Sequence, residues 1–180
     1  MSPMKPYVVG IDLGGTNTVF GIVDARGVVI ASSSIKTCKH NTVEGFIEDL
    51  YVELTRLIKA NDAEGKIHGI GIGAPNANYY TGMIEDAVNL PWPTPIPLAK
   101  LVSEKFGIPV TITNDANAAA IGEMTYGAAR GLKDFIMITL GTGVGSGIVI
   151  NGQLVYGHDG FAGELGHVIM KRNNGRLCGC

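Results

Sequence analysis

Hydrophobic and polar positions change their period several times along this chain, and each change marks a structural element. Residues 7–13 form a short apolar run, residues 17–24 alternate, and residues 27–36 resume the pattern after a turn, which predicts three strands. Between residues 41 and 61 apolar side chains recur every three or four positions, which predicts a helix with Asn41 as its N-cap. The rest of the chain reads as strand, helix, strand and helix, followed by a second set of strands.

Two stretches of the sequence echo each other. "GIDLGGTNTVFGIVD" and "ITLGTGVGSGIVING" each read as a strand, a turn of glycine and threonine, and a second strand. Alternating strands and helices predict a mixed α/β architecture. The echo predicts two related lobes that face each other across a cleft. A proline-rich stretch at residues 89–98 excludes helix and central strand, and is interpreted as an ordered connector rather than as a proline-rich ligand for a partner.

Composition narrows the class of protein. The chain has 180 residues, of which 46% are hydrophobic, so it can bury a core. Its 14 basic and 16 acidic residues give a net charge of -2 without a basic stripe, which argues against a nucleic-acid partner. No apolar run is long enough to cross a membrane, and the N-terminal stretch turns polar too early for a secretion signal. Three cysteines do not suggest a disulfide framework, so we expect a cytoplasmic protein.

The two glycine turns carry the first candidate chemistry. Backbone N–H groups in such turns can line up on phosphate oxygens, and a threonine hydroxyl adds a donor. An acidic residue at the end of the preceding strand, Asp12, is suited to hold a magnesium ion. One Gly-Gly-Thr turn is weak evidence, but two such turns can hold a triphosphate from opposite sides. The phosphate-loop and dinucleotide fingerprints are both absent from the sequence.

A carboxylate lies between the two turns, in "TNDANAAA". Asp115 stands at the start of an alanine-rich helix, where an aspartate commonly serves only as an N-cap. A kinase that acts on a sugar also needs one carboxylate near the attacking hydroxyl. The residues alone leave both roles open. In the kinase reading, Asp115 is the base and Asp12 holds the metal.

The C-terminal stretch "GELGHVIMKRNNGRLCGC" carries a candidate metal site. Glu164 and His167 are three residues apart, which places them on one face if the segment is helical. His167, Cys178 and Cys180 form an array of imidazole and thiolate ligands that suits zinc. Structural zinc takes four ligands, and this stretch supplies three of them.

Taken together, these motifs resemble the ROK family of repressors, open reading frames and sugar kinases, and most closely its bacterial glucokinases. The resemblance runs in order through "GIDLGGTNTVFGIVD", "GIGAPNANYYTG", "NLPWPTPIPL", "TNDANAAAIGE", "LGTGVGSGIVINGQLVYG" and "GELGHVIM", with "CGC" beyond. It implies an actin/hexokinase-type fold with two ribonuclease H-like lobes. Residues 1–116 would form the N-terminal α/β lobe, and residues 117–180 would begin the larger second lobe.

The resemblance also implies a function and a set of site residues. The implied reaction is ATP-dependent phosphorylation of a hexose, most simply glucose at its 6-hydroxyl, by a homodimer that uses magnesium and a structural zinc. Asp115 would be the general base, and His167 would both contact the sugar and bind zinc. The implied phosphate-binding residues are Asp12, Gly14, Gly15, Thr16, Gly141, Thr142 and Gly143. The implied sugar-binding residues are Asn89, Asn114, Asp115, Glu164 and His167, with Asn76 and Asn78 as weaker candidates.

Family members continue past "CGC" into a longer second lobe, so we expect this chain to be a fragment that lacks the fourth zinc ligand and is inactive alone. Two alternatives to a kinase stay open. One is a ROK-type regulator that senses a sugar, although regulators carry a DNA-binding segment first and only six residues precede the first strand here. The other is a sugar-binding module without catalysis.

Overall fold

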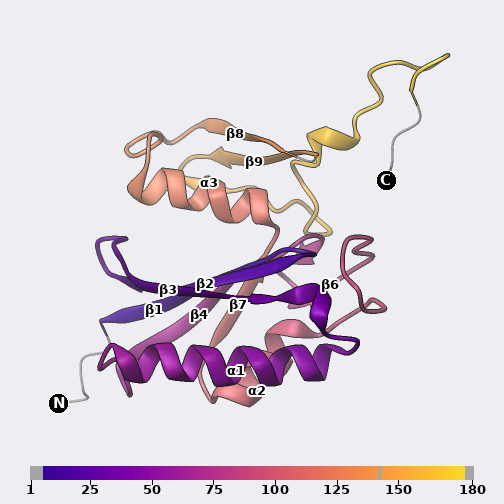
Figure 1. Cartoon of the computed structure of the whole chain (residues 1–180). Helices are drawn as coiled ribbons and strands as arrows, with labels where there is room; N and C mark the ends of the chain where they lie inside the picture. The colour runs from indigo at the N-terminus through magenta and orange to yellow at the C-terminus, as the bar shows by residue number, and fades with distance from the viewer. Residues whose placement is uncertain (1–5, 142, 177–180) are drawn as a thin grey trace.

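The computed structural model describes residues 6–141 and 143–176, and its two larger sheets have a helix between them (Figure 1). The larger sheet has five strands in the order β3-β2-β1-β4-β7. Its strands are β1 (Tyr7–Leu13), β2 (Asn17–Asp24), β3 (Val29–Lys36), β4 (Ile67–Gly73) and β7 (Val110–Thr113). The first three strands pair antiparallel, whereas β4 and β7 run parallel to β1.

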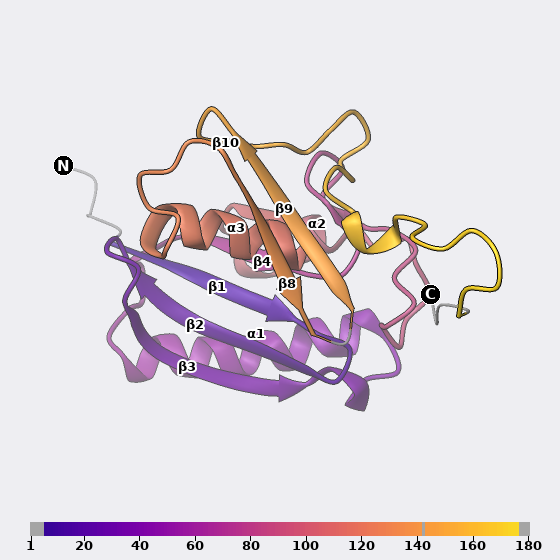
Figure 2. The same ribbon diagram turned by 90° about the horizontal axis from the view of Figure 1, so that it is seen from above.

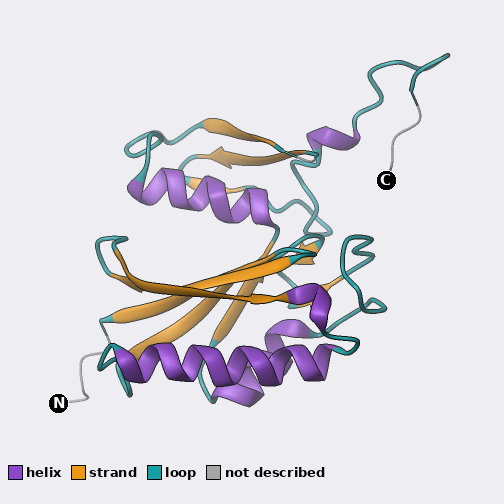
Figure 3. Cartoon of the chain, in the orientation of Figure 1, coloured by secondary structure: helices purple, strands orange, loops and turns teal. Residues whose placement is uncertain are grey.

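Two helices, α1 (Val43–Ala60) and α2 (Leu98–Phe106), cover one face of this sheet (Figures 1 and 3). A short 3-10 turn, η1 (Thr37–Lys39), precedes α1. The apolar stripe of α1 is buried in the core, as its spacing predicts. The predicted N-cap was wrong by one residue: Thr42 has the extended backbone of a cap, and its side chain accepts a hydrogen bond from the backbone N–H of Gly45. Gly107 ends α2 in the left-handed conformation that commonly closes a helix.

The second sheet lies on the opposite side of the five-stranded sheet from α1, with α3 (Asp115–Tyr126) between the two sheets (Figures 1 and 2). Its strands are β8 (Phe135–Leu140), β9 (Val144–Ile150) and β10 (Gln153–Leu154), in the antiparallel order β10-β9-β8. Two glycines of β9 allow α3 to approach closely, because a Cβ on Gly145 would crowd Ala116 and one on Gly147 would crowd Ala120.

Three short elements complete the described chain. β5 (Ala77–Asn78) and β6 (Met83–Ile84) form a small hairpin, and η2 (Leu165–His167) follows the second sheet. The sequence echo is confirmed as a structural one, since β1–β2 and β8–β9 are both antiparallel pairs joined by a glycine turn. The lobe boundary suggested after residue 116 falls in the first turn of α3 and stays a proposal. No helix within the described ranges is long and apolar enough to span a membrane.

Candidate functional site

The two glycine turns meet at the same edge of the molecule. In the first turn the backbone N–H of Gly14 donates to the carbonyl of Asn17 at 3.1 Å. In the second turn the N–H of Gly141 donates to the carbonyl of Gly143 at 3.0 Å. Glycines of both turns line one cavity of about 540 Å³, so the two turns face a common space as the sequence echo predicts.

This cavity gathers most of the predicted site residues from six separate segments. It is lined by Asp12, Gly14, Gly15, Asn89, Asn114, Asp115, Gly141, Gly143, Glu164 and His167, by the weaker candidate Asn76, and by Leu13, Pro75, Thr139, Leu140, Val144 and Gly145. Residues with carboxylate, amide and imidazole groups therefore surround, together with glycines of the two turns, a space large enough for small polar ligands. We call it the polar cavity.

Asp12 enters the polar cavity from the end of β1. The strand is fixed on both sides, because Asp12 pairs with Val19 of β2 and with Gly73 of β4. Burial raises the pKa of the Asp12 carboxyl, and the negative charge of Asp115 raises it further. A negative charge at Asp12 is thus disfavoured by its surroundings and would be stabilised by a cation.

Asp115 is the first residue of α3, and its role as a simple N-cap is not supported. The N-cap is Asn114, whose side-chain oxygen accepts from the N–H of Ala116 at 2.8 Å. One carboxylate oxygen of Asp115 also accepts from that N–H, at 2.7 Å. The positive end of the helix dipole stabilises the carboxylate at this position. Asn114 therefore occupies the N-cap position, while Asp115 lines the polar cavity and has one carboxylate oxygen that takes no part in that hydrogen bond.

Asn89 reaches the cavity from the proline-rich connector at residues 89–98. This connector is ordered, since the indole N–H of Trp92 donates to the carbonyl of His40 at 2.9 Å and its ring packs against Phe46 at 4.9 Å between centroids. Ile96 forms a bridge with Ile84 of β6. The apolar side chains of the connector are therefore buried in the fold, which supports its interpretation as an ordered connector, while Pro91, Pro93 and Pro95 stay exposed.

Glu164 and His167 reach the cavity from η2. Glu164 is the N-cap of this 3-10 turn and His167 is its last residue, which brings them to one face as their spacing predicts: the Nε2 of His167 lies 3.8 Å from the Oε2 of Glu164. Both residues line the polar cavity. A carboxylate beside an imidazole provides acceptors and a donor for neighbouring hydroxyl groups.

Some of the predicted site residues do not line the polar cavity or lie outside the described residues. Thr16 flanks the first turn but is outside the set of residues that line the cavity, and its carbonyl accepts from the N–H of Thr37. Asn78 is buried, and its side chain joins the backbone of Asp159 to that of Tyr80, so its contacts are structural. Thr142, Cys178 and Cys180 lie outside the described residues. The zinc site that includes the two cysteines therefore stays a prediction.

Residues that the sequence did not single out also line the cavity, notably Thr139 and Val144, which flank the second turn. Thr139 stands two positions before Gly141, where Asp12 stands two positions before Gly14, so the echo itself offered a signal for it. Val144 gave no chemical signal, because an apolar valine side chain carries no reactive or hydrogen-bonding group.

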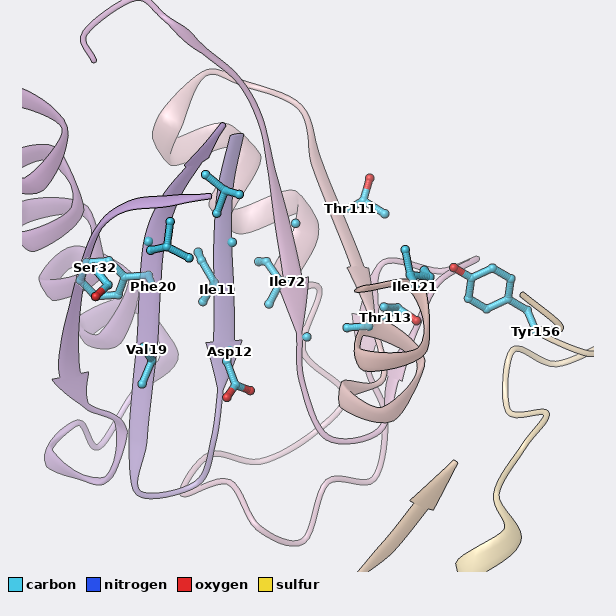
Figure 4. Close-up of a pocket in the computed structure, with 17 residues that line it drawn as sticks. Ile11, Asp12, Val19, Phe20, Ser32, Ile72, Thr111, Thr113, Ile121 and Tyr156 are labelled. Carbon is cyan, nitrogen blue, oxygen red and sulfur yellow. The ribbon is translucent and has the colours of Figure 1, made fainter. Parts of the chain in front are cut away.

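A second cavity, of about 690 Å³, opens between the five-stranded sheet and α3 (Figure 4). Apolar side chains dominate its lining, including Val19 of β2 and Ile121 of α3, and Tyr156 approaches it from the second lobe. Asp12 lies at its edge (Figure 4). Because it lacks the clustered donors and charges that phosphate or sugar needs, the polar cavity is the better candidate site.

The oxygen donors of the polar cavity suit magnesium. A magnesium ion takes carboxylate oxygen and phosphate oxygen, and Asp12, with its raised pKa, beside Asp115 and two phosphate-type turns, fits that preference. Among the described residues no group of three or more histidine, cysteine and acidic side chains is arranged to hold a metal by itself. A magnesium site here would thus need oxygen atoms from a bound phosphate.

Comparisons with known proteins agree with this geometry. The family model described as "ROK family" matches residues 8–180. The glucokinase of Halalkalibacterium halodurans is 38% identical over 97% of this chain and 53% of its own length. A putative xylose repressor from a Caldicellulosiruptor species is 35% identical over 96% of this chain and 43% of its own length. The chain thus spans about half the length of the curated relatives that it matches.

A solved structure supports the fold directly. A ROK family glucokinase from Streptomyces griseus, in complex with glucose and AMPPNP, is 37% identical, with a TM-score of 0.79 over 97% of this chain and 54% of the other. The α/β arrangement seen here is the actin/hexokinase-like fold of these relatives. With a family model that matches residues 8–180 and relatives more than 30% identical along nearly the whole chain, this chain belongs to the ROK family.

Proposed function

We propose that this chain carries the sugar and phosphate subsites of an ATP-dependent hexose kinase, with glucose as the acceptor through its 6-hydroxyl. The observation that supports it best is the polar cavity, in which two glycine turns from separate lobes and the carboxylates of Asp12 and Asp115 face one space. The likeness to a glucokinase that binds glucose and AMPPNP favours a hexose and ATP over other ligands.

The reaction assigns each group one task. Asp115 accepts the proton of the sugar hydroxyl while the hydroxyl oxygen forms a bond to the γ-phosphorus and the bond from that phosphorus to the bridging oxygen breaks, which releases ADP. Asn89, Asn114, Glu164 and His167 orient the sugar through hydrogen bonds. Backbone N–H groups of the two turns hold the phosphates. Asp12 would hold magnesium, which neutralises phosphate charge when bound.

The remaining assignments complete the proposal. His167, Cys178 and Cys180 would bind a structural zinc that orients the imidazole, with a further ligand from outside this sequence. We propose a homodimer that acts on small molecules in the cytoplasm. Because the relatives are about twice as long, activity of these 180 residues alone is expected to be weak or absent.

One observation favours a second function. A putative xylose repressor is 35% identical across 96% of this chain, so the same cavity also suits a regulator that senses a sugar. A regulator needs sugar binding but no base at Asp115. A sugar-binding module without catalysis makes the same demand.

ADP release distinguishes these functions. The chain is incubated with magnesium-ATP and, in turn, glucose, mannose, fructose and N-acetylated hexosamines, with ADP measured by a coupled assay and glucose binding measured by calorimetry. A kinase releases ADP only when its sugar is present. Glucose binding without ADP release, both in this chain and in a version extended beyond Cys180, would refute the kinase and support the sensor or the binding module.

A further inference from the structure

Two glycines bring predicted sugar-binding segments into backbone contact with the phosphate turns. Gly15 lies in the first turn, and a Cβ built on it would overlap the backbone carbonyl oxygen of Asn89. Gly166 lies in η2, and a Cβ built on it would overlap the backbone carbonyl oxygen of Val144. Val144 directly follows Gly143 of the second turn. The segment that contains Asn89 therefore contacts the first phosphate turn, and η2 contacts the end of the second phosphate turn.

Close approach alone requires glycine at these two positions. Neither residue has a positive φ, so the backbone conformation would accept alanine. Real Cβ atoms essentially never come within 3.0 Å of such neighbours, and both obstructing atoms are backbone oxygens, which cannot rotate away as a flexible side chain can. By contrast, a Cβ on Gly141 or Gly143 would meet nothing within 4 Å. Gly141 and Gly143 therefore do not share the tight contact, and the nearest neighbour of a Cβ on Gly14 would be the carbonyl oxygen of Asn17 within the same turn, at 3.0 Å. Contact with the backbone of a predicted sugar-binding segment distinguishes Gly15.

Both contacts lead to residues of the polar cavity. Asn89 is one of the residues that line the cavity, so the carbonyl oxygen in contact with Gly15 belongs to a predicted sugar ligand. Gly166 lies between Glu164 and His167, and all three residues are part of one 3-10 turn and its cap. A shift of either contact therefore moves a sugar ligand relative to the phosphates.

We propose that Gly15 and Gly166 are positioning residues that couple the sugar subsite to the phosphate subsite, an inference that rests on the proposed hexose kinase function. Phosphate binding fixes a glycine turn. The backbone contact passes that constraint to Asn89 in the first lobe and to η2 in the second. Sugar binding fixes the same contacts from the other side, so each ligand tightens the site for the other.

Two substitutions test the coupling. Glucose and magnesium-AMPPNP are titrated by calorimetry, each alone and each in the presence of a saturating amount of the other, which gives a coupling factor. Gly15→Ala and Gly166→Ala are expected to weaken glucose binding about tenfold or more, because a small misplacement of a ligand group is costly, and to bring the coupling factor close to one. A coupling factor that stays at its wild-type value in both variants would overturn the proposal.

Matched controls come from glycines with open space around them. A Cβ on Gly10 of β1 or on Gly122 of α3 would meet nothing within 4 Å. Gly10→Ala and Gly122→Ala are therefore expected to retain the wild-type affinities and the wild-type coupling factor. Loss of coupling in these controls as well would show a general effect of added methyl groups and would count against the proposal.

A second measurement tests the contacts without any ligand. Amide hydrogen exchange, read by peptide, is expected to rise in residues 86–98 for Gly15→Ala and in residues 162–170 for Gly166→Ala. Unchanged exchange in both segments would overturn the positioning role. If the wild-type chain binds neither ligand, the proposed function fails while the exchange data still decide the positioning role. η2 lies on the surface outside the main core, so Gly166→Ala is expected to fold even if Gly15→Ala does not.

Discussion

The two glycine turns that form the two halves of the polar cavity have similar geometry, but the sheets that carry them differ in size and in burial. The first turn rises from a five-stranded sheet whose hydrophobic core is drawn from residues 9–112 and includes α1 and α2. The second turn rises from a three-stranded sheet whose β8 leaves Ile136, Ile138 and Leu140 between 54% and 81% exposed.

This difference shows that the same turn geometry can occur twice in one chain although the sheets that carry it are packed differently. α3 packs against β9 through small residues, and little else among the described residues covers the second sheet. Segments with few buried apolar contacts open at a lower free energy than core strands do. We therefore expect that, in this 180-residue chain, the second half of the site opens at a lower free energy than the first half.

The largest expected effect concerns the residue at the junction of the two halves. Asp115→Asn removes the proposed base but keeps the size of the side chain and its position at the start of α3. Phosphoryl transfer, measured as sugar-dependent ADP release in a form of the protein that is active, is expected to fall by about 10²- to 10⁴-fold. Glucose affinity, measured by calorimetry, is expected to stay within a few fold. Equal loss of transfer and of binding would instead indicate a structural role for Asp115.

A core substitution in the first lobe should have the next largest effect. Phe46 of α1 is fully buried and packs against Trp92, so Phe46→Ala is expected to lower the free energy of unfolding by about 3–5 kcal/mol. Urea denaturation followed by the fluorescence of Trp92, the single tryptophan, measures it. Val52→Ala on the same helix is the control, because Val52 is exposed and should change stability by less than about 0.5 kcal/mol.

A core substitution in the three-stranded sheet should lower the free energy of unfolding by less than Phe46→Ala does. Val149 of β9 is fully buried, and Val149→Ala removes two buried methyl groups, which predicts a loss of about 1.6 kcal/mol by chemical denaturation followed by circular dichroism. Amide exchange in β8 and β9 should also be faster than in β1 and β4 in the unmodified chain. Slower exchange in β8 and β9 than in β1 and β4 would contradict the inference that the three-stranded sheet is the less stable of the two.

Much of this comparison could be read from the sequence, because periodicity reports which side of an element is buried. The stripe of α1 and the echoed turns were predicted correctly for that reason. The N-cap was misplaced by one residue, since Asn41 and Thr42 are both good caps and only the backbone decides between them. The place of Thr16 outside the cavity, and the contacts of Gly15 and Gly166, depend on how distant segments meet, which no local pattern encodes.

The smallest expected effect concerns the negative charge of Asp12 and its influence on the stability of the fold. Burial and the Asp115 carboxylate raise the pKa of Asp12 above its ordinary value of 3.8, so ionisation of Asp12 opposes folding. This penalty is absent below pH 3.8 and grows as the pH rises through the raised pKa. Asp12→Asn should therefore raise the melting temperature at pH 7, by at most about 3 °C because the carboxylate is only partly buried and water still screens it, and the gain should vanish in acid.

Thermal melts from pH 3 to pH 8 measure this difference, with Asp24→Asn as a contrasting control. Hydrogen bonds from the N–H of Val28 and from Arg26 lower the pKa of Asp24, so that carboxylate stabilises the fold once it is ionised. Asp24→Asn should thus lower the melting temperature at neutral pH, opposite in sign to Asp12→Asn. If both variants shifted in the same direction, the surroundings of Asp12 would not disfavour its charge, and the case for a cation at the end of β1 would lose its electrostatic basis.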